Sequence, residues 1–151
     1  EKPTSLSVQA LLTDLVLKKT MKQEEADVIN VPRVVHFFET FLGELTLTNK
    51  TRREVPFMYL INAKEIYETE TAEQTIVQGI VDCLVETEDG LIIIDYKTDR
   101  IIGEWEKVSE SYRKKYEVQI NLYAEAIEAA SARPVVAKYL YFFDGGHIAE
   151  L

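Results

Sequence analysis

The stretch from Thr75 to Lys97 constrains the fold most, because two β-rich runs flank a short segment of turn-forming residues. The runs are Thr75–Glu86 and Leu91–Lys97, and the second is rich in isoleucine. Residues 87–90 read Thr-Glu-Asp-Gly, a composition typical of turns. The sequence therefore predicts an antiparallel hairpin, with one strand on either side of residues 87–90.

Two helical patterns precede this hairpin and one follows it. The first begins near residue 8, and its apolar stripe is expected to be buried: Val8, Leu11, Leu12, Leu15 and Val16. The second begins near Pro32 and is expected to stop near Gly43. Its stripe consists of Val34, Phe37, Phe38, Phe41 and Leu42. The third covers residues 109–130, and one of its faces carries Tyr112, Tyr116, Gln119, Ile120, Tyr123 and Ile127.

Further strands are predicted on both sides of these elements, at Val55–Ile61 and at Val135–Phe143, the latter closed by the turn residues 144–146. This order of helices and strands is typical of an α/β or α+β layer, with a mixed sheet flanked by helices. With 151 residues and 46% apolar content, residues 1–151 fit a single domain.

The composition excludes several kinds of site. Cys83 is the only cysteine, so the chain can form no internal disulfide, no cysteine-based zinc site and no iron–sulfur cluster. The net charge of −9 argues against a broad non-specific nucleic-acid surface, because such surfaces rely on Lys and Arg. We therefore expect oxygen or nitrogen ligands for any metal, and a local site or a helping partner for any DNA.

The ends and the hydropathy of the chain predict its setting. No apolar run approaches the ~18–20 residues of a membrane span, and the first residues lack the layout of a secretory signal. We therefore expect a cytoplasmic protein without membrane contacts. The chain begins with Glu1 rather than Met, which suggests a domain of a longer protein that is truncated at its N-terminus.

Two aspartates of the hairpin are candidates for a shared site. Residues two apart in a strand share a face, so Asp95 and Lys97 point the same way. If residues 87–90 form a four-residue loop, Asp82 lies directly opposite Asp95, and the two carboxylates repel unless a cation separates them. If the loop has two residues, Asp82 instead faces Lys97 in an ordinary cross-strand ion pair. The hairpin by itself leaves both registers open.

The first register would create a magnesium site. Mg²⁺ commonly takes one or two carboxylates and keeps waters that a substrate phosphate can displace. Mn²⁺ tolerates the same ligands and could substitute. Lys97 could then orient or help to deprotonate a metal-bound water and offset charge on the phosphate. This is the chemistry of phosphodiester hydrolysis.

Three segments resemble the motifs of the RecB-type branch of the PD-(D/E)xK nuclease superfamily: Gly79–Asp82, Leu91–Asp99 and Gln119–Tyr123. Two more, Phe38–Gly43 and Arg53–Phe57, look like the C-terminal nuclease domain of AddA (RexA) proteins, which couple a helicase motor to a nuclease. The resemblance covers roughly residues 8–143. It implies a restriction-endonuclease-like αβββαβ core.

The resemblance also implies residue roles. Asp82 and Asp95 would be the ligands of Mg²⁺, the Tyr96 carbonyl a third ligand, and Lys97 the catalytic lysine. RecB-type nucleases generally add a histidine, which in AddA-like sequences precedes the segment that begins here.

Neither histidine of this chain fits that role. His36 lies about 200° from Val34 on a helical wheel, opposite the apolar stripe, so we expect it to face solvent. His147 lies in a Gly-Gly-His turn and is no better a candidate.

Three other residues are supporting candidates. Gln119 and Tyr123 are four apart on a helix and share a face, which is otherwise apolar. By resemblance they lie beside the active site and contact DNA or the reactive phosphate. The alternative is a glutamine that bonds core carbonyls and a tyrosine that packs. Glu54 resembles an acidic residue that could support the site, contact DNA or pair with Arg52 or Arg53.

These observations predict a Mg²⁺-dependent DNA exonuclease domain of a bacterial helicase–nuclease. By resemblance it cuts single strands delivered by a motor in the same polypeptide, beside a partner of the AddB/RexB type, in double-strand-break repair and recombination. Basic residues between positions 100 and 115 could guide the strand, although interleaved glutamates favour a solvated face. The alternative function is a non-catalytic domain of nuclease fold, used for DNA guidance or protein docking.

Overall fold

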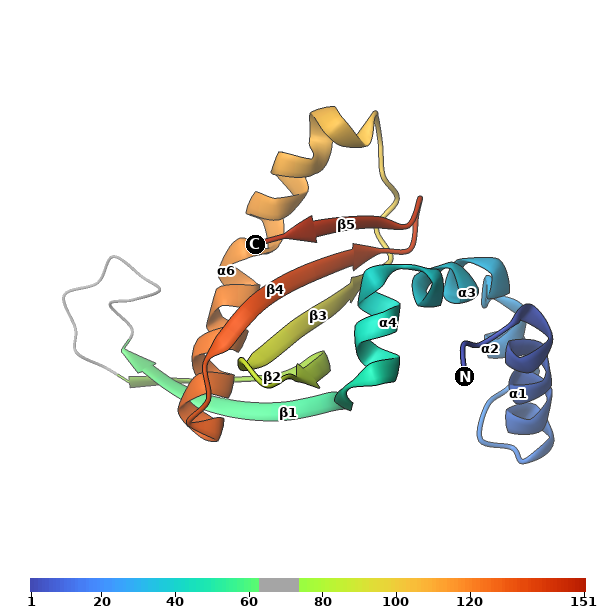
Figure 1. Cartoon of the computed structure of the whole chain (residues 1–151), viewed down its shortest axis with the longest axis horizontal. Helices are drawn as coiled ribbons and strands as arrows, with labels where there is room; N and C mark the ends of the chain where they lie inside the picture. Colours follow the sequence, from blue (N-terminus) through green and yellow to red (C-terminus); the bar gives the residue numbers. More distant parts are fainter. Residues whose placement is uncertain (63–73) are drawn as a thin grey trace.

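The computed structural model describes residues 1–62 and 74–151, and Figure 1 shows the arrangement of their helices and strands. The elements in chain order are α1 (Ser5–Leu17), α2 (Gln23–Asp27), α3 (Val31–Glu39), α4 (Phe41–Thr48), β1 (Lys50–Asn62), β2 (Gln74–Glu86), β3 (Leu91–Lys97), α6 (Trp105–Ser131), β4 (Val135–Phe142) and β5 (His147–Glu150).

The strands form one mixed sheet in the order β1-β2-β3-β4-β5. Adjacent strands are antiparallel except β3 and β4, which are parallel. A parallel pair needs a long crossover connection, and α6 supplies it. The predicted mixed sheet flanked by helices is confirmed.

Helix α6 covers one face of the sheet, which we call the α6 face (Figure 1). Ile120, Ala126 and Ile127 of the helix pack there against buried residues of the sheet that include Ile93 and Leu140. Burying such aliphatic side chains is worth roughly 1.5–3 kcal/mol each relative to leaving them in water. This cluster fixes α6 over β3 and β4.

Helices α3 and α4 lie against the opposite face, which we call the α3–α4 face. Phe37 and Leu42 pack there with Cys83, Ile94 and the other buried side chains of a second cluster. Strand β3 supplies side chains to both clusters in alternation, and its first five residues are all buried. It is therefore the central strand of a three-layer molecule.

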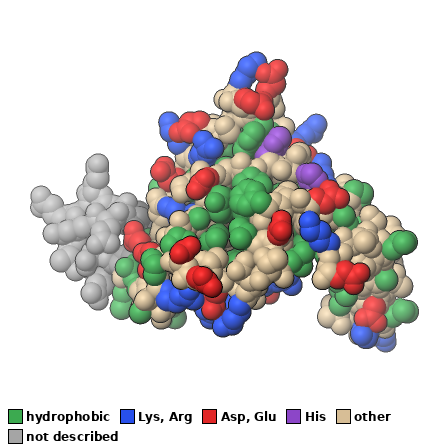
Figure 2. All heavy atoms as spheres, in the orientation of Figure 1, with side chains coloured by type: hydrophobic (Ala, Val, Ile, Leu, Met, Phe, Trp, Pro, Cys, Tyr) green, Lys and Arg blue, Asp and Glu red, His purple; other side chains and the backbone are tan. Residues whose placement is uncertain are grey.

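Helices α1 and α2 form a lobe beside the main body, at the right of Figure 2. The predicted first helix is present, but the prediction that its apolar stripe is buried is wrong. No residue of α1 is buried, and Leu11 is exposed. The helix rests mainly on α3 and has no second layer that would bury its stripe within the described part of the chain. No helix in residues 1–62 and 74–151 is long and apolar enough to cross a membrane.

The single helix predicted from Pro32 to Gly43 is also wrong, because the chain breaks at Thr40. The Thr40 backbone is extended, and its side chain accepts a hydrogen bond from the Gly43 amide at 3.3 Å, which starts α4. Gly43 is therefore not a stop signal. It lies inside α4, where a Cβ atom would come within 2.3 Å of the Phe37 carbonyl oxygen.

We expect Gly43→Ala to destabilise the protein by about 1–3 kcal/mol, because α3 and α4 would have to move apart. Denaturant unfolding of the variant, compared with Glu44→Ala at the exposed neighbouring position, measures the effect. Equal unfolding free energies for the two variants would show that the close approach at Gly43 does not hold the helices together.

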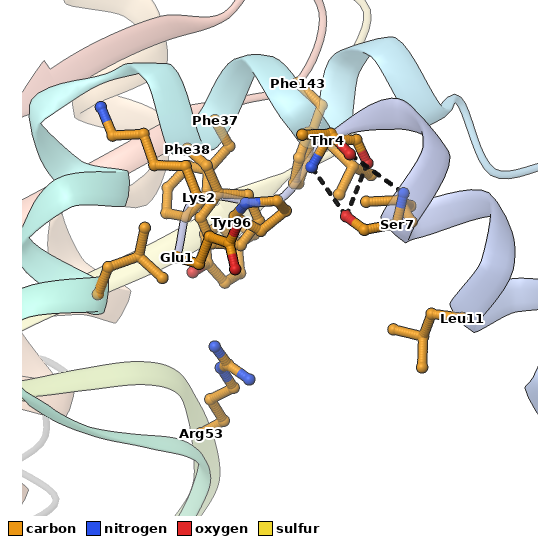
Figure 3. A pocket seen from close by; sticks show the side chains of 14 residues that line it. Glu1, Lys2, Thr4, Ser7, Leu11, Phe37, Phe38, Arg53, Tyr96 and Phe143 are labelled. Atoms are coloured by element: carbon orange, nitrogen blue, oxygen red, sulfur yellow. Dashed lines mark hydrogen bonds between the residues drawn. The ribbon is translucent and has the colours of Figure 1, made fainter.

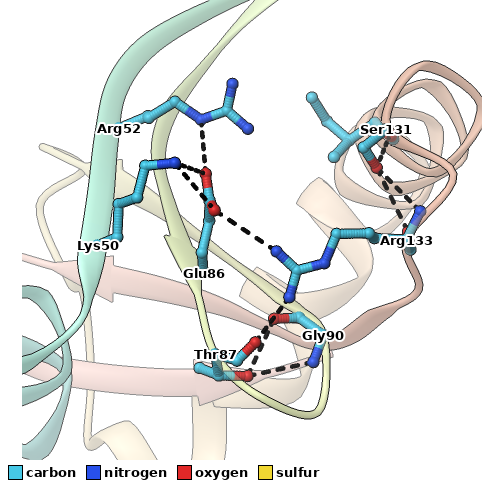
Figure 4. Close-up of polar contacts among 8 residues, drawn as sticks. Lys50, Arg52, Glu86, Thr87, Gly90, Ser131 and Arg133 are labelled. Carbon is cyan, nitrogen blue, oxygen red and sulfur yellow. Dashed lines mark hydrogen bonds and ion pairs between the residues drawn. The ribbon is translucent and has the colours of Figure 1, made fainter.

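A cluster of charges joins the start of β1 to the end of β2 (Figure 4). Glu86 lies 3.3 Å from Lys50, 3.1 Å from Arg52 and 3.5 Å from Arg133. Arg133 also donates to the Thr87 carbonyl at 2.7 Å, which attaches the segment before β4 to the hairpin loop. The Lys50 hydrogen bond is the largest cause that lowers the pKa of Glu86. Its stabilising effect is therefore present above the ordinary Glu pKa and is lost as the pH falls through the lowered value.

Candidate active site

The hairpin has the four-residue loop that the first register requires. Glu86 pairs with Leu91, and the ladder continues to Cys83 opposite Ile94. The next position places Asp82 opposite Asp95, so the alternative register, with Asp82 opposite Lys97, is wrong. The Thr87 amide closes the loop by donating to the Gly90 carbonyl at 2.9 Å.

Asp95 and Lys97 lie on the α6 face of β3, two residues beyond Ile93. The Lys97 ammonium lies 2.6 Å from Asp95 Oδ2, and both side chains are largely shielded, with exposures of 12% and 6%. Asp95 is the only charged residue that is buried in the described part of the chain. A carboxylate that is buried in this way indicates a functional or paired group.

The carboxylate of Asp82 reaches the end of β3 from the neighbouring strand. Its Oδ2 accepts a hydrogen bond from the Tyr96 amide at 2.9 Å. In a continuing ladder this amide would bond to the backbone of β2, but the last paired residues are Cys83 and Ile94. The side chain of Asp82 thus replaces the missing ladder bond, next to Asp95.

Burial raises the pKa of Asp95, the nearby Lys97 ammonium lowers it, and the charge of Asp82 raises it further. The net direction is upward, so burial outweighs the lysine. Asp95 Oδ2 accepts no well-directed hydrogen bond from the described residues. Its contact with Lys97 is therefore a close ion pair, and the oxygen retains capacity for another positive partner.

Helix α6 holds Lys97 from above. The Lys97 ammonium donates to Gln119 Oε1 at 3.2 Å and lies 3.9 Å from the centre of the Tyr116 ring. Gln119 in turn donates to the Tyr123 hydroxyl at 3.0 Å. The three segments that resemble nuclease motifs therefore meet in one place. Burial, followed by the charge of Asp95, raises the pKa of Tyr123.

Gln119 differs from its prediction in one respect, because it is exposed rather than part of a buried stripe. It bonds to Lys97 and Tyr123 instead of to core carbonyls. Tyr116 is a site residue whose role the sequence did not indicate, although its spacing from Gln119 and Tyr123 puts all three on one helix face. Its hydroxyl donates to Asp99 at 2.7 Å, which fixes the ring beneath Lys97.

Gly79 lets the aromatic wall of the site close. A Cβ atom at this position would come within 2.8 Å of the Phe57 ring and 3.4 Å of Tyr123. The Phe57 and Tyr123 rings meet edge to face at 5.0 Å. The glycine of the first motif therefore serves packing beside the carboxylates.

These donors fit a hard divalent cation. Asp82 and Asp95 supply two carboxylates, and Asp95 Oδ2 is a buried oxygen without a directed hydrogen bond. The carbonyl of an extended residue points to the same side as its amide, so the Tyr96 carbonyl is directed toward the Asp82 side of β3. In residues 1–62 and 74–151 no group of three or more His, Cys, Asp or Glu could hold a metal. Water and a substrate phosphate would therefore complete the coordination, as Mg²⁺ prefers.

Glu54 lies in the slot of β1 that faces Asp82, between the pairs Arg53–Cys83 and Val55–Val81. It is exposed, and its φ is 50°, in the left-handed region. For a residue other than glycine this conformation costs about 1–2 kcal/mol. The backbone at the edge of the site is thus strained.

Both histidines lie away from the carboxylates. His36 is 53% exposed on α3 and lies 3.2 Å from Glu39, which confirms that it faces solvent. His147 stacks on Trp105 with ring centres 4.6 Å apart. Both rings flank the turn at residues 145–146, where added Cβ atoms would meet them.

The basic residues near the start of α6 are largely paired with acids. Lys107 pairs with Glu104, and Lys115 lies 2.5 Å from Asp99. Glu110 is within 4 Å of two more basic side chains. Acidic and basic side chains are also interspersed over the face seen in Figure 2. This arrangement favours a solvated, ion-paired face over a strand-guiding surface.

A cavity of about 690 Å³ lies on the α3–α4 side, between the α1 lobe and the sheet (Figure 3). Phe37, Phe38 and the ring of Tyr96 line it, with Arg53 at one side. The carboxylates of Asp82 and Asp95 do not line this cavity. The candidate site is instead the convergence of β2, β3 and α6.

Comparisons with known proteins agree with this geometry. The sequence profile of the PD-(D/E)XK nuclease superfamily matches residues 4–149. The A component of the ATP-dependent helicase/nuclease of Listeria innocua serovar 6a is 42% identical over 100% of this chain and 13% of its own length. The proteins of the same name from Bacillus cytotoxicus and Bacillus licheniformis are 40% and 41% identical over 96% and 97% of this chain.

The chain thus spans 12–13% of the length of these relatives. Among solved structures, the crystal structure of SSO0001 overlaps 97% of this chain and 60% of its own, with a TM-score of 0.47 and 13% identity. The family profile covers nearly all of the chain, including the three motif segments. The chain belongs to the PD-(D/E)XK nuclease superfamily.

Proposed function

We propose that this chain is a Mg²⁺-dependent DNA nuclease domain whose active site consists of Asp82, Asp95 and Lys97. The observation that carries the proposal is the meeting of two adjacent carboxylates with a shielded lysine at 2.6 Å. A structural ion pair would need one acid. The second carboxylate raises the pKa of Asp95, an arrangement that a bound cation would offset.

In this proposal the Asp82 and Asp95 carboxylates and the Tyr96 carbonyl hold the cation. When bound, Mg²⁺ neutralises charge on the scissile phosphate and lowers the pKa of water. Lys97 orients the attacking water and offsets the negative charge that grows on the phosphate. Hydrolysis forms a bond from the water oxygen to phosphorus, breaks the bond to the leaving sugar oxygen, and transfers a proton to that oxygen.

Gln119 and Tyr123 position this lysine and contact the substrate. Gln119 is exposed while bonded to Lys97, so its amide is available to a phosphate oxygen next to the ammonium. Tyr123 orients the Gln119 amide from the buried side. The pair thus links the lysine to the strand to be cut.

The relatives are named as components of an ATP-dependent helicase/nuclease, and we extend this setting to the chain. The domain would act as an exonuclease on single strands produced by a motor in the same polypeptide, with an AddB/RexB-type partner, in double-strand-break repair and recombination. A cytoplasmic, nucleoid-associated location follows from such a substrate. The net charge of −9 favours delivery of DNA by a motor over independent capture.

We expect the protein to cut linear single-stranded DNA in the presence of Mg²⁺ or Mn²⁺ and to stop when EDTA is added. The measurement is release of nucleotides from an end-labelled strand over a titration of each cation. Cleavage that persists in EDTA would contradict metal dependence. DNA binding without cleavage at saturating Mn²⁺ would favour a non-catalytic guidance domain instead.

A further inference from the structure

The strained residue Glu54 lies at a point where two neighbouring strands change faces together. In a regular strand, residues two apart share a face. In β1, however, Val55 packs on the α6 face, whereas Arg53 lines the cavity on the α3–α4 side (Figure 3). Their partners in β2 behave alike, because Val81 belongs to the α6-face cluster and Cys83 to the other.

The crossover in both strands therefore falls on the facing residues Glu54 and Asp82. Three described residues other than glycine have positive φ: Lys19, Glu54 and Ala132. Lys19 and Ala132 follow the ends of α1 and α6, where the left-handed conformation is common. Glu54 is the one within a strand, and it supplies the backbone reversal that β1 needs to change faces.

The reversal places the Asp82 side chain where the site requires it. A side chain at a crossover belongs to neither face, and the Asp82 carboxylate lies between the strands, bonded to the Tyr96 amide at 2.9 Å. Tyr96 separates Asp95 from Lys97 in the sequence. This one hydrogen bond therefore sets the position of Asp82 relative to both other site residues.

We propose that the left-handed backbone at Glu54 positions the Asp82 carboxylate, and that the backbone conformation rather than the Glu54 carboxylate performs this role. The inference rests on the proposed nuclease function for its kinetic consequence only. It makes Glu54 a positioning residue, since its carboxylate forms no part of an acidic cluster that could hold a metal in the described residues. Strain of this kind concentrates at active sites.

The test compares side chains that differ in tolerance of positive φ. Glu54→Val and Glu54→Thr are branched at Cβ and resist the left-handed region, whereas Glu54→Gly adopts it readily. Glu54→Gln keeps the shape of the parent side chain and removes its charge. We expect kcat to fall about 10²-fold in the branched variants with KM for single-stranded DNA unchanged, because a misplacement of about 1 Å has such an effect. The glycine and glutamine variants should keep the parent kcat.

A second readout does not depend on activity. Hydrogen exchange of the Tyr96 amide, measured by NMR on the metal-free protein, reports its bond to Asp82. Protection should be lost in the valine and threonine variants and kept in the glycine and glutamine variants. Two branched variants are included because threonine, smaller and polar at an exposed position, can fold where valine does not.

Equal losses in the glutamine, glycine and valine variants would overturn the proposal, since they would assign the role to the carboxylate. Parent-like kcat and Tyr96 protection in the branched variants would also overturn it. If the parent protein shows no metal-dependent cleavage, the proposed function fails, and the Tyr96 exchange pattern still decides the positioning role.

Discussion

Asp95→Asn is expected to lower the rate of DNA cleavage by at least about 10³-fold, because it removes a charged ligand while keeping the shape of the side chain. The parent and variant should bind single-stranded DNA with similar affinity. Asp89→Asn, in the exposed loop of the same hairpin, is the matched control and should cut at the parent rate. Full activity in Asp95→Asn would remove Asp95 from the active site.

The same variant should also be more stable than the parent in EDTA at neutral pH. The pKa of Asp95 is raised in the folded protein, so its favourable contribution is complete below the ordinary Asp pKa of ~3.9 and is lost as the pH rises through the raised value. Asparagine mimics the neutral form at every pH. The gain in Tm should therefore be largest at neutral pH and shrink toward pH 4, with each kcal/mol equal to about 2–4 °C. A loss of stability at neutral pH would show that the Lys97 ion pair outweighs burial.

Lys97→Ala is expected to lower kcat by about 10²–10³-fold, because one preorganised positive charge next to the phosphate is worth that much. Binding of Mn²⁺ should persist, since the carboxylates remain. This combination distinguishes a lysine that assists the reaction from one that only folds the site. Lys97→Arg should not restore the rate, because a guanidinium does not give up a proton and has a different shape.

Lys107→Ala is the control for this variant, because Lys107 is exposed and paired with Glu104 in the same region of the molecule. Its kcat should equal that of the parent. Equal kcat values for Lys97→Ala and the parent would assign Lys97 to the stability of Asp95 alone.

The sequence predicted the hairpin well, because turn residues separate two runs that are rich in apolar side chains. A slip of one residue would turn the isoleucines of β3 to the wrong layers, so the pattern excludes it. A slip of two residues keeps every side chain on its face, which is why two loop lengths stayed open. The pairing of Glu86 with Leu91 decides between them and brings Asp82 beside Asp95.

Other features depend on tertiary contacts that a pattern does not contain. Gly43 looks like a helix end, but its role is the close approach of α4 to the Phe37 carbonyl. Gln119 is exposed because the helix face that carries it extends past the core to the edge of the site. Glutamate has no preference for positive φ, so nothing in the sequence indicated the reversal at Glu54. The break at Thr40 was missed because the apolar period runs on through it.

The central claim is that Asp82 and Asp95 hold one divalent cation beside Lys97. A crystal structure of the protein with Mn²⁺, with anomalous data collected at its absorption edge, tests this most directly. We predict an anomalous peak between the two carboxylates, within about 2.0–2.4 Å of an oxygen of each, and no peak there in Asp95→Asn. A peak bound elsewhere, or a peak between Asp82 and Asp95 that survives the substitution unchanged, would contradict the account.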